Sequence, residues 1–108
     1  PVPAPATWLR ARLHVRALEW VHVRPPSPSG EGHRVRVGAG TTLRALVACL
    51  RAHGLCLPSL PMHLDATVGG AVCAGSHGSS LHHGTLSDSV TDVRLATADG
   101  RARWLLAE

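Results

Sequence analysis

The sequence predicts a small α+β domain, and three observations lead to this prediction. Segments with alternating apolar residues lie towards both ends of the chain, as in β-strands. Between them lies a segment whose apolar residues recur every three or four positions, as in an α-helix. The chain has 108 residues, of which 44% are hydrophobic and 17% charged, so it can form one small core but not a second complete domain.

The first strands are expected in the N-terminal third. Residues 13–23 alternate loosely between polar and apolar side chains, which predicts one or two short strands. Residues 1–12 form an N-terminal segment for which the sequence predicts no defined element. Residues 24–32 contain three prolines and two glycines and predict a surface loop. Alternation resumes over residues 33–37, so we expect a hairpin whose second strand stops at Gly38.

A helix is predicted over residues 42–53. Either Thr41 or Thr42 can cap its start, and Gly54 is a typical C-terminal stop. Its apolar residues have helical spacing at Leu43, Leu46, Val47 and Leu50.

A second hairpin is predicted at the C-terminal end. Residues 90–97 alternate as in a half-buried strand, and Asp99 followed by Gly100 indicates a turn into residues 101–106. The face expected to be buried carries Val93, Leu95 and Thr97.

The segment between the helix and the second hairpin has an unusual composition. Pro58 and Pro61 predict an extended, turning path rather than a central strand. In residues 66–80, every side chain except two valines and one histidine is Ala, Gly, Ser, Thr or Cys. Five glycines occur in and just after this run, at Gly69, Gly70, Gly75, Gly78 and Gly84.

This glycine run favours backbone recognition of an anion. No Lys or Arg lies between Arg51 and Arg94, so an anion bound here would depend on amide N–H groups and hydroxyls. A cofactor pyrophosphate suits that mode of binding. A tightly packed Gly/Ala turn without any ligand explains the same composition equally well.

Charge and cysteine content exclude little. The formal net charge is +4 and all eleven cations are arginines, scattered as on a solvated face and without a nucleic-acid motif, so we expect no nucleic-acid partner. Cys49, Cys56 and Cys73 are odd in number and form no C-x-x-C pair. We expect buried free thiols, which favours a reducing compartment.

The sequence gives weaker support to three other kinds of site: a dinucleotide-binding loop, a zinc site and a nucleophilic cysteine. Gly38-Ala39-Gly40 follows a strand and opens a helix, but it lacks the third glycine and the later acidic residue of a dinucleotide-binding loop. Zinc binding by Cys73, His77, His82 and His83 has no common ligand spacing. A nucleophilic Cys73–His77 pair has no identifiable group to orient the imidazole. We therefore expect no metal ligand and no catalytic side chain.

Five short motifs follow one another within residues 35–100. They are V-x-V-x-A-G-T-x-L-x-x-L, H-G-L-x-L-P-x-L, T-V-G-G, G-[ST]-H-G-[ST]-[SG] followed by H-G, and V-x-x-L-x-T-A-D-G. In this order they resemble the FAD-binding domain (PCMH type) of vanillyl-alcohol-oxidase-like flavoproteins. Among these flavoproteins the resemblance is strongest to the sugar-lactone oxidases, which oxidise L-gulonolactone or D-arabinono-1,4-lactone.

The resemblance implies that residues 1–108 are part of that domain, namely its second α/β lobe. In the family, the T-V-G-G and G-S-H-G backbones line the FAD pyrophosphate, the ribityl chain and one flank of the flavin ring. His77 would pin the loop beside the flavin rather than carry a proton. Carried over to this sequence, the residues at or near FAD are Ser59, Leu60, Thr67, Val68, Gly69, Gly70, Gly75, Ser76, His77, Gly78 and Gly84.

The implied activity of a complete protein is hydride transfer from a CH–OH group of a sugar lactone to FAD, with O2 or another acceptor taking the electrons. The family's first lobe and its C-terminal substrate-binding cap have no counterpart in these residues. We therefore expect half an FAD site, a small-molecule substrate bound through a missing cap, and no activity from this fragment alone. An intracellular or membrane-associated location fits the lactone oxidases.

Two alternatives stay open. The same lobe serves alditol, cytokinin and hydroxy-acid oxidation, so the substrate is not fixed by the motifs. A truncated, non-catalytic relic would keep the motifs without binding flavin.

Overall fold

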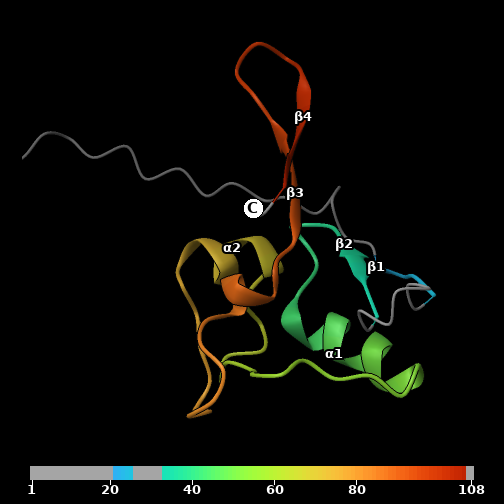
Figure 1. The fold of residues 1–108 in the computed structure, drawn as a ribbon, viewed down its shortest axis with the longest axis vertical. Coiled ribbons are helices and arrows are strands. Elements are labelled where there is room, and N and C mark those ends of the chain that lie inside the picture. The colour runs from blue at the N-terminus through green and yellow to red at the C-terminus, as the bar shows by residue number, and fades with distance from the viewer. Residues whose placement is uncertain (1–20, 26–32, 107–108) are drawn as a thin grey trace, which may run out of the picture.

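The computed structural model describes residues 21–25 and 33–106 and shows a mixed helix-and-sheet fold, as the α+β prediction requires (Figure 1). Its described elements, in chain order, are β1 (Val21–Val23), β2 (Val35–Val37), α1 (Leu43–Ala52), α2 (Val68–Cys73), the 3-10 helix η2 (Leu86–Ser89), β3 (Asp92–Ala96) and β4 (Ala102–Leu106).

The first predicted hairpin is confirmed. β1 and β2 pair antiparallel, with Val21 opposite Val37. The rest of the first predicted strand and most of the predicted loop, residues 13–20 and 26–32, lie outside the described residues. Both sheets of the described chain are antiparallel pairs of strands, so they contain no parallel βαβ unit of the kind a dinucleotide-binding loop requires.

The predicted helix is also confirmed. Thr42 is its N-cap, and its hydroxyl accepts a hydrogen bond from the Ala45 amide at 3.2 Å. Gly54 follows the helix with a φ of 69°, a left-handed conformation that favours glycine. The Leu55 amide then donates to the Leu50 carbonyl at 2.9 Å, which closes the helix end. The buried face carries Leu43, Leu46 and Leu50.

Two short helices were not predicted from the sequence. Two of the six residues of α2 are glycines and two are valines, which are weak helix formers. The helix forms because Thr67 caps its start and Ala71 is buried against neighbouring elements. In η2, the carboxylate of Asp88 accepts the Thr85 amide N–H at 2.7 Å. Both helices therefore depend on capping and packing rather than on helix propensity.

The core lies where α1, α2 and η2 meet. Leu43, Ala71 and Leu86 are its buried members, with exposed fractions of 0%, 1% and 6%. Partly buried side chains packed around them are Leu57, Leu64, Ala66, Val68 and Val72. This small cluster fixes the glycine run against α1.

The second hairpin has the predicted turn but not the predicted burial. Val93 lies opposite Leu105 and Leu95 opposite Arg103, on one face. Every residue of both strands is exposed, including Leu95 at 46% and Leu105 at 53%. The half-buried strand was therefore a wrong prediction, because alternation identifies an apolar face but not whether another element covers it.

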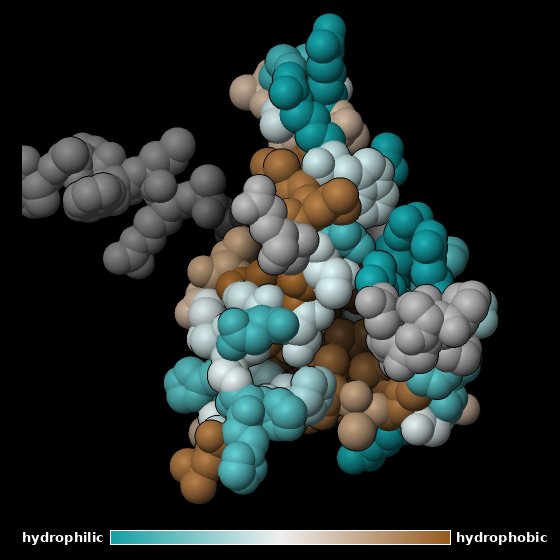
Figure 2. All heavy atoms as spheres, in the orientation of Figure 1, coloured by the Kyte–Doolittle hydropathy of each residue, from teal (hydrophilic) through white to brown (hydrophobic). Residues whose placement is uncertain are grey.

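Figure 1 shows this hairpin projecting away from α1 and α2. In Figure 2, brown apolar side chains are exposed along its lower part and teal polar ones at its tip. The guanidinium of Arg36 lies 4.9 Å from the centre of the Trp104 ring, so a cation–π contact links the hairpin to β2.

The expectation of buried thiols was wrong for two cysteines. Cys56 and Cys73 are exposed, and Cys49 is partly buried. Cys56 lies on the irregular path after α1, and Cys73 ends a helix whose buried residue is Ala71.

We predict that Leu43→Ala destabilises the fold by about 3 kcal/mol, because it removes a fully buried side chain from a small core. The shift in the midpoint of denaturant unfolding measures this. Leu81→Ala is the matched control, since Leu81 is 96% exposed and its loss should change stability by less than about 0.5 kcal/mol. Equal midpoints for the two variants would contradict the assigned core.

We also predict that Asp99 titrates below the ordinary pKa of an aspartate. The hydroxyl of Thr97, the amide of Arg101 and the guanidinium of Arg103 all donate to its carboxylate, and these bonds lower its pKa from 3.8. Since the folded pKa is the lower one, the turn gains stability above the unfolded pKa and loses it as the pH falls through the folded pKa.

Carboxyl NMR titration measures the pKa of Asp99 directly. Thr97→Val removes the largest contribution and should move that pKa upward. An unchanged titration curve in this variant would contradict the hydrogen-bond explanation.

Candidate functional site

The starts of α1 and α2 are joined through their backbones. Residues 39–44 run antiparallel to residues 64–69, with Thr42 opposite Thr67. The N-terminal amides of each helix thereby find acceptors in the other segment, which places the T-V-G-G motif beside the start of α1. Four bonds of 2.8 or 2.9 Å hold the pairing: Leu43 to Ala66, Arg44 to Leu64, Val68 to Thr41 and Gly69 to Ala39.

The two glycines of the T-V-G-G motif have different surroundings. A Cβ at Gly69 would lie 2.9 Å from the Ala39 Cβ, so glycine permits the close pairing of the two helix starts. A Cβ at Gly70 would have only the Thr67 hydroxyl near it, at 3.1 Å, and Gly70 is exposed. The Gly70 amide donates to that hydroxyl at 3.1 Å. Gly70 is therefore the exposed glycine of this motif, and a side chain there would press on the hydroxyl that caps α2.

Gly75 is explained by the end of α2. It has a φ of 64°, and its amide donates to the Val72 carbonyl at 3.2 Å. The Ser76 amide donates to the Ala71 carbonyl at 2.9 Å. This is the Schellman pattern of a helix C-terminus, which requires a residue that tolerates a left-handed conformation.

The S-H-G turn packs on the proline-rich segment. The Gly78 amide donates to the Ser59 hydroxyl at 3.1 Å. A Cβ at Gly78 would lie 2.7 Å from both the Ser59 hydroxyl and the Leu60 carbonyl. The structure thus brings Ser59 and Leu60 together with a turn about twenty residues later.

The far side of the same turn contacts the segment before η2. The Leu86 amide donates to the Ser76 carbonyl at 2.8 Å, and His77 pairs with Thr85 in a single antiparallel bridge. A Cβ at Gly84 would clash with the Asp88 carboxylate, which caps η2. Glycine at this position is therefore explained by the cap.

The eleven predicted residues form a linked chain of contacts from α2 through the S-H-G turn to the segment before η2. One of them, Val68, also packs its side chain against the core. The amides of Val68, Gly69, Gly70, Gly75, Ser76 and Gly78 already donate within the chain. A ligand at these positions would share N–H groups that already have an acceptor.

Ser79 and Ser80 were not among the predicted site residues. Among the described residues, their amide N–H groups have no hydrogen-bond acceptor. The Ser80 hydroxyl accepts the amides of His82 and His83 at 3.2 Å. Both serines belong to the G-[ST]-H-G-[ST]-[SG] motif, which was the available signal for them.

The donor set of this surface suits a ligand bound by the backbone and by hydroxyls. The hydroxyls of Ser59 and Thr67 each accept one amide and keep a hydrogen to donate. Arg44, the cation at the start of α1, is paired with Asp65 at 3.0 Å. These features fit an uncharged or backbone-held part of a nucleotide cofactor better than a site that depends on salt bridges.

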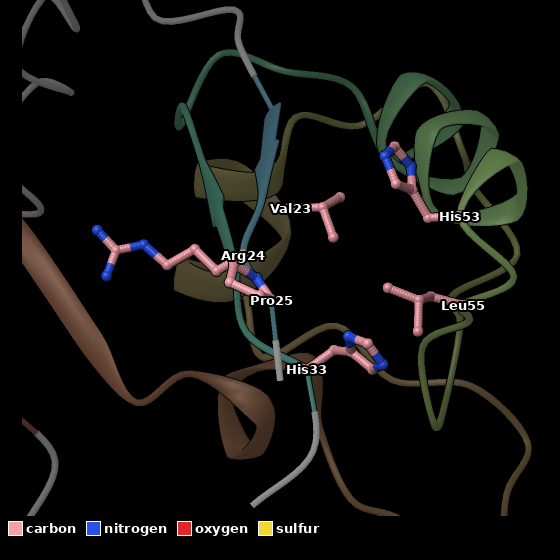
Figure 3. A pocket seen from close by; sticks show the side chains of 6 residues that line it. All are labelled: Val23, Arg24, Pro25, His33, His53 and Leu55. Atoms are coloured by element: carbon pink, nitrogen blue, oxygen red, sulfur yellow. The ribbon is translucent and has the colours of Figure 1, made fainter. Parts of the chain in front are cut away.

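The cavity in Figure 3 lies elsewhere. It has a volume of about 240 Å3 and is bounded by β1, the segment before β2 and the end of α1. Val23, His53 and Leu55 face the space, whereas the Arg24 side chain points away from it (Figure 3). None of the eleven predicted residues lines it.

Residues 21–25 and 33–106 contain neither a metal-binding cluster nor a membrane-spanning helix. No three His, Cys, Asp or Glu side chains there gather closely enough to hold a metal ion. No helix in this part of the chain is both long and apolar enough to cross a membrane.

Comparison with known proteins gives consistent matches. An FAD-binding domain family matches residues 22–106. Relatives include an alditol oxidase from Streptomyces sp. (42% identical over 66 residues), L-gulonolactone oxidase from Mus musculus (40% over 70 residues) and UDP-N-acetylenolpyruvoylglucosamine reductase from Desulfosudis oleivorans (35% over 82 residues). No solved structure matches significantly.

The matched stretches cover 61%, 65% and 76% of this chain but only 16%, 16% and 25% of those relatives. The chain thus spans a small part of the length of each relative. The family match itself covers most of the described residues and the whole predicted site. The chain therefore belongs to the FAD-binding domain family, and its cofactor is FAD.

Proposed function

We propose that this chain is the second α/β lobe of a PCMH-type FAD-binding domain in an FAD-linked oxidoreductase. The enzyme oxidises a CH–OH group of a sugar lactone or a related polyol and passes electrons to O2 or another acceptor. The observation that carries the proposal is the family match over residues 22–106, which includes all eleven proposed site residues from Ser59 to Gly84.

The eleven residues of this surface contact FAD mainly through their backbones. Leu60 and Val68 contribute main-chain atoms, since the Val68 side chain packs against the core. Thr67 and Ser59 donate their hydroxyl hydrogens to the cofactor while accepting an internal amide. Ser79 and Ser80 add amide N–H groups with no other acceptor among the described residues. Anionic oxygens are the natural partners of such donors.

This lobe supplies hydrogen bonds to the pyrophosphate but no salt bridge. Between Arg51 and Arg94 the sequence has no Lys or Arg. The remaining charge compensation must come from another part of the protein, which agrees with the small fraction of each relative that the chain spans. We accordingly expect this lobe alone to bind FAD weakly and to have no activity.

When bound, FAD supplies the hydride acceptor for the oxidation. The residues of this lobe orient the cofactor and provide no proton-transferring side chain in our proposal. Lactone or polyol as substrate is supported by the alditol oxidase and L-gulonolactone oxidase relatives. The substrate binds through a cap domain outside these residues.

We predict that Gly70→Val lowers FAD affinity by about tenfold or more in the intact protein, because the valine side chain covers the exposed start of α2 and presses on the Thr67 hydroxyl, a proposed donor to the cofactor. Flavin absorbance per polypeptide after purification measures the effect. Gly75→Val is a poorer test, since its φ of 64° makes any branched residue strained whether or not a ligand binds.

Two controls accompany this variant. Ala48→Val introduces the same side chain at an exposed position on α1 that is not among the eleven site residues, and His82→Ala changes an exposed residue after the S-H-G turn. Both should keep FAD. Wild-type flavin content in a folded Gly70→Val protein would contradict the proposed site.

We predict that the flavin of the intact protein is bleached under anaerobic conditions by a sugar lactone or an alditol. Its absorbance is followed while a panel of both classes is mixed with the protein, with unoxidisable deoxy analogues as controls. Bound FAD that no member of either class bleaches would refute the proposed substrate class while leaving FAD binding intact.

A further inference from the structure

We infer that Nε2 of the neutral His77 ring is a hydrogen-bond acceptor, and that its partner is an N–H or O–H donor of the flavin, the ribityl chain or the substrate rather than a phosphate. This inference rests on the proposed function, because it concerns the same FAD surface. It adds the chemical role of one side chain and names Ser59 as the residue that positions it.

The backbone on both sides of His77 is fixed by neighbouring segments. Before it, the Ser76 carbonyl accepts the Leu86 amide at 2.8 Å. After it, the Gly78 amide donates to the Ser59 hydroxyl at 3.1 Å, and Gly78 packs so closely on that segment that a Cβ would not fit. Ser59 therefore holds the turn from which the imidazole projects.

The contact of the imidazole with the next residue places a hydrogen on Nδ1. Its Nδ1 lies 2.9 Å from the Gly78 carbonyl oxygen. A carbonyl oxygen only accepts hydrogen bonds, so Nδ1 must carry the hydrogen. In the neutral ring, Nε2 is then the acceptor. No described residue donates to it.

The orientation of this ring contributes little to the packing of the described fold. The His77 side chain is exposed and is not among the core residues. A ring that only filled space would not need both a fixed turn and a fixed tautomer. In the neutral ring, one lone pair is left without a donor among the described residues, on a residue of the proposed cofactor surface.

The lone pair selects the kind of partner. A phosphate oxygen also offers only lone pairs, so it gains nothing from a neutral Nε2. A flavin imide N–H, a ribityl hydroxyl or a substrate hydroxyl can donate to it. Anionic oxygens would instead meet the serine and threonine donors of the same surface.

Two substitutions distinguish the role of Nδ1 from the role of Nε2. His77→Asn places an amide N–H near the position of Nδ1 and removes the group at Nε2. His77→Gln reaches the position of Nε2 with an oxygen acceptor and gives up the bond to the Gly78 carbonyl. His82→Ala is the matched control, an exposed histidine in the same loop.

The experiment titrates the intact protein with FAD, followed by flavin fluorescence, and with ADP, which carries the phosphates without the flavin. If the donor belongs to the cofactor, His77→Asn weakens FAD binding by about fivefold, His77→Gln weakens it less, and ADP binding is unchanged. If the donor belongs to the substrate, FAD binding is unchanged and KM rises by a similar factor in His77→Asn only.

Nitrogen-15 NMR of the imidazole supplies a readout that is independent of binding. It should show a protonated Nδ1 and an unprotonated Nε2 in the neutral ring. In Ser59→Ala, the fraction of neutral rings with the hydrogen on Nδ1 should fall. A protonated Nε2, equal loss of ADP and FAD affinity, or variants that match the wild type in both FAD affinity and KM would overturn the inference. Failure of the wild type to bind FAD would instead refute the proposed function.

Discussion

The antiparallel pairing of residues 39–44 with residues 64–69 is the contact on which the rest of this structure depends. It satisfies the first amides of α1 and α2 with carbonyls of the opposite segment. It also holds α2, a poor helix by composition, where Ala71 can meet Leu43 and Leu86 in the core. Without this pairing, the glycine run would have neither a defined helix nor a fixed position beside α1.

The glycines between residues 69 and 78 are required for different structural reasons. Gly69 permits close approach to Ala39, Gly75 allows the left-handed end of α2, and Gly78 fits against Ser59 and its neighbour. Gly70 is exposed, and a Cβ there would meet only the Thr67 hydroxyl, at 3.1 Å. Close packing, one of the two explanations that the sequence left open, thus accounts for Gly69 and Gly78, and the proposed ligand surface uses the same segment.

The elements that were predicted correctly depend on local signals. α1 follows from its apolar spacing, Thr42 and Gly54, and the C-terminal hairpin from Asp99 and Gly100. α2 could not be predicted in this way, because its stability depends on partners more than twenty residues earlier in the chain. The burial of β3 was mispredicted for a related reason, since alternation describes one strand and burial requires a second element.

The sequence by itself determined the family and the cofactor, because the order and spacing of five motifs are properties of the chain that need no coordinates. It also determined that no cation lies between Arg51 and Arg94. Only the tertiary structure decided which amides are already bonded and which glycines leave no room for a Cβ. Those properties depend on contacts between Ser59, the S-H-G turn and η2, and a linear pattern does not specify such contacts.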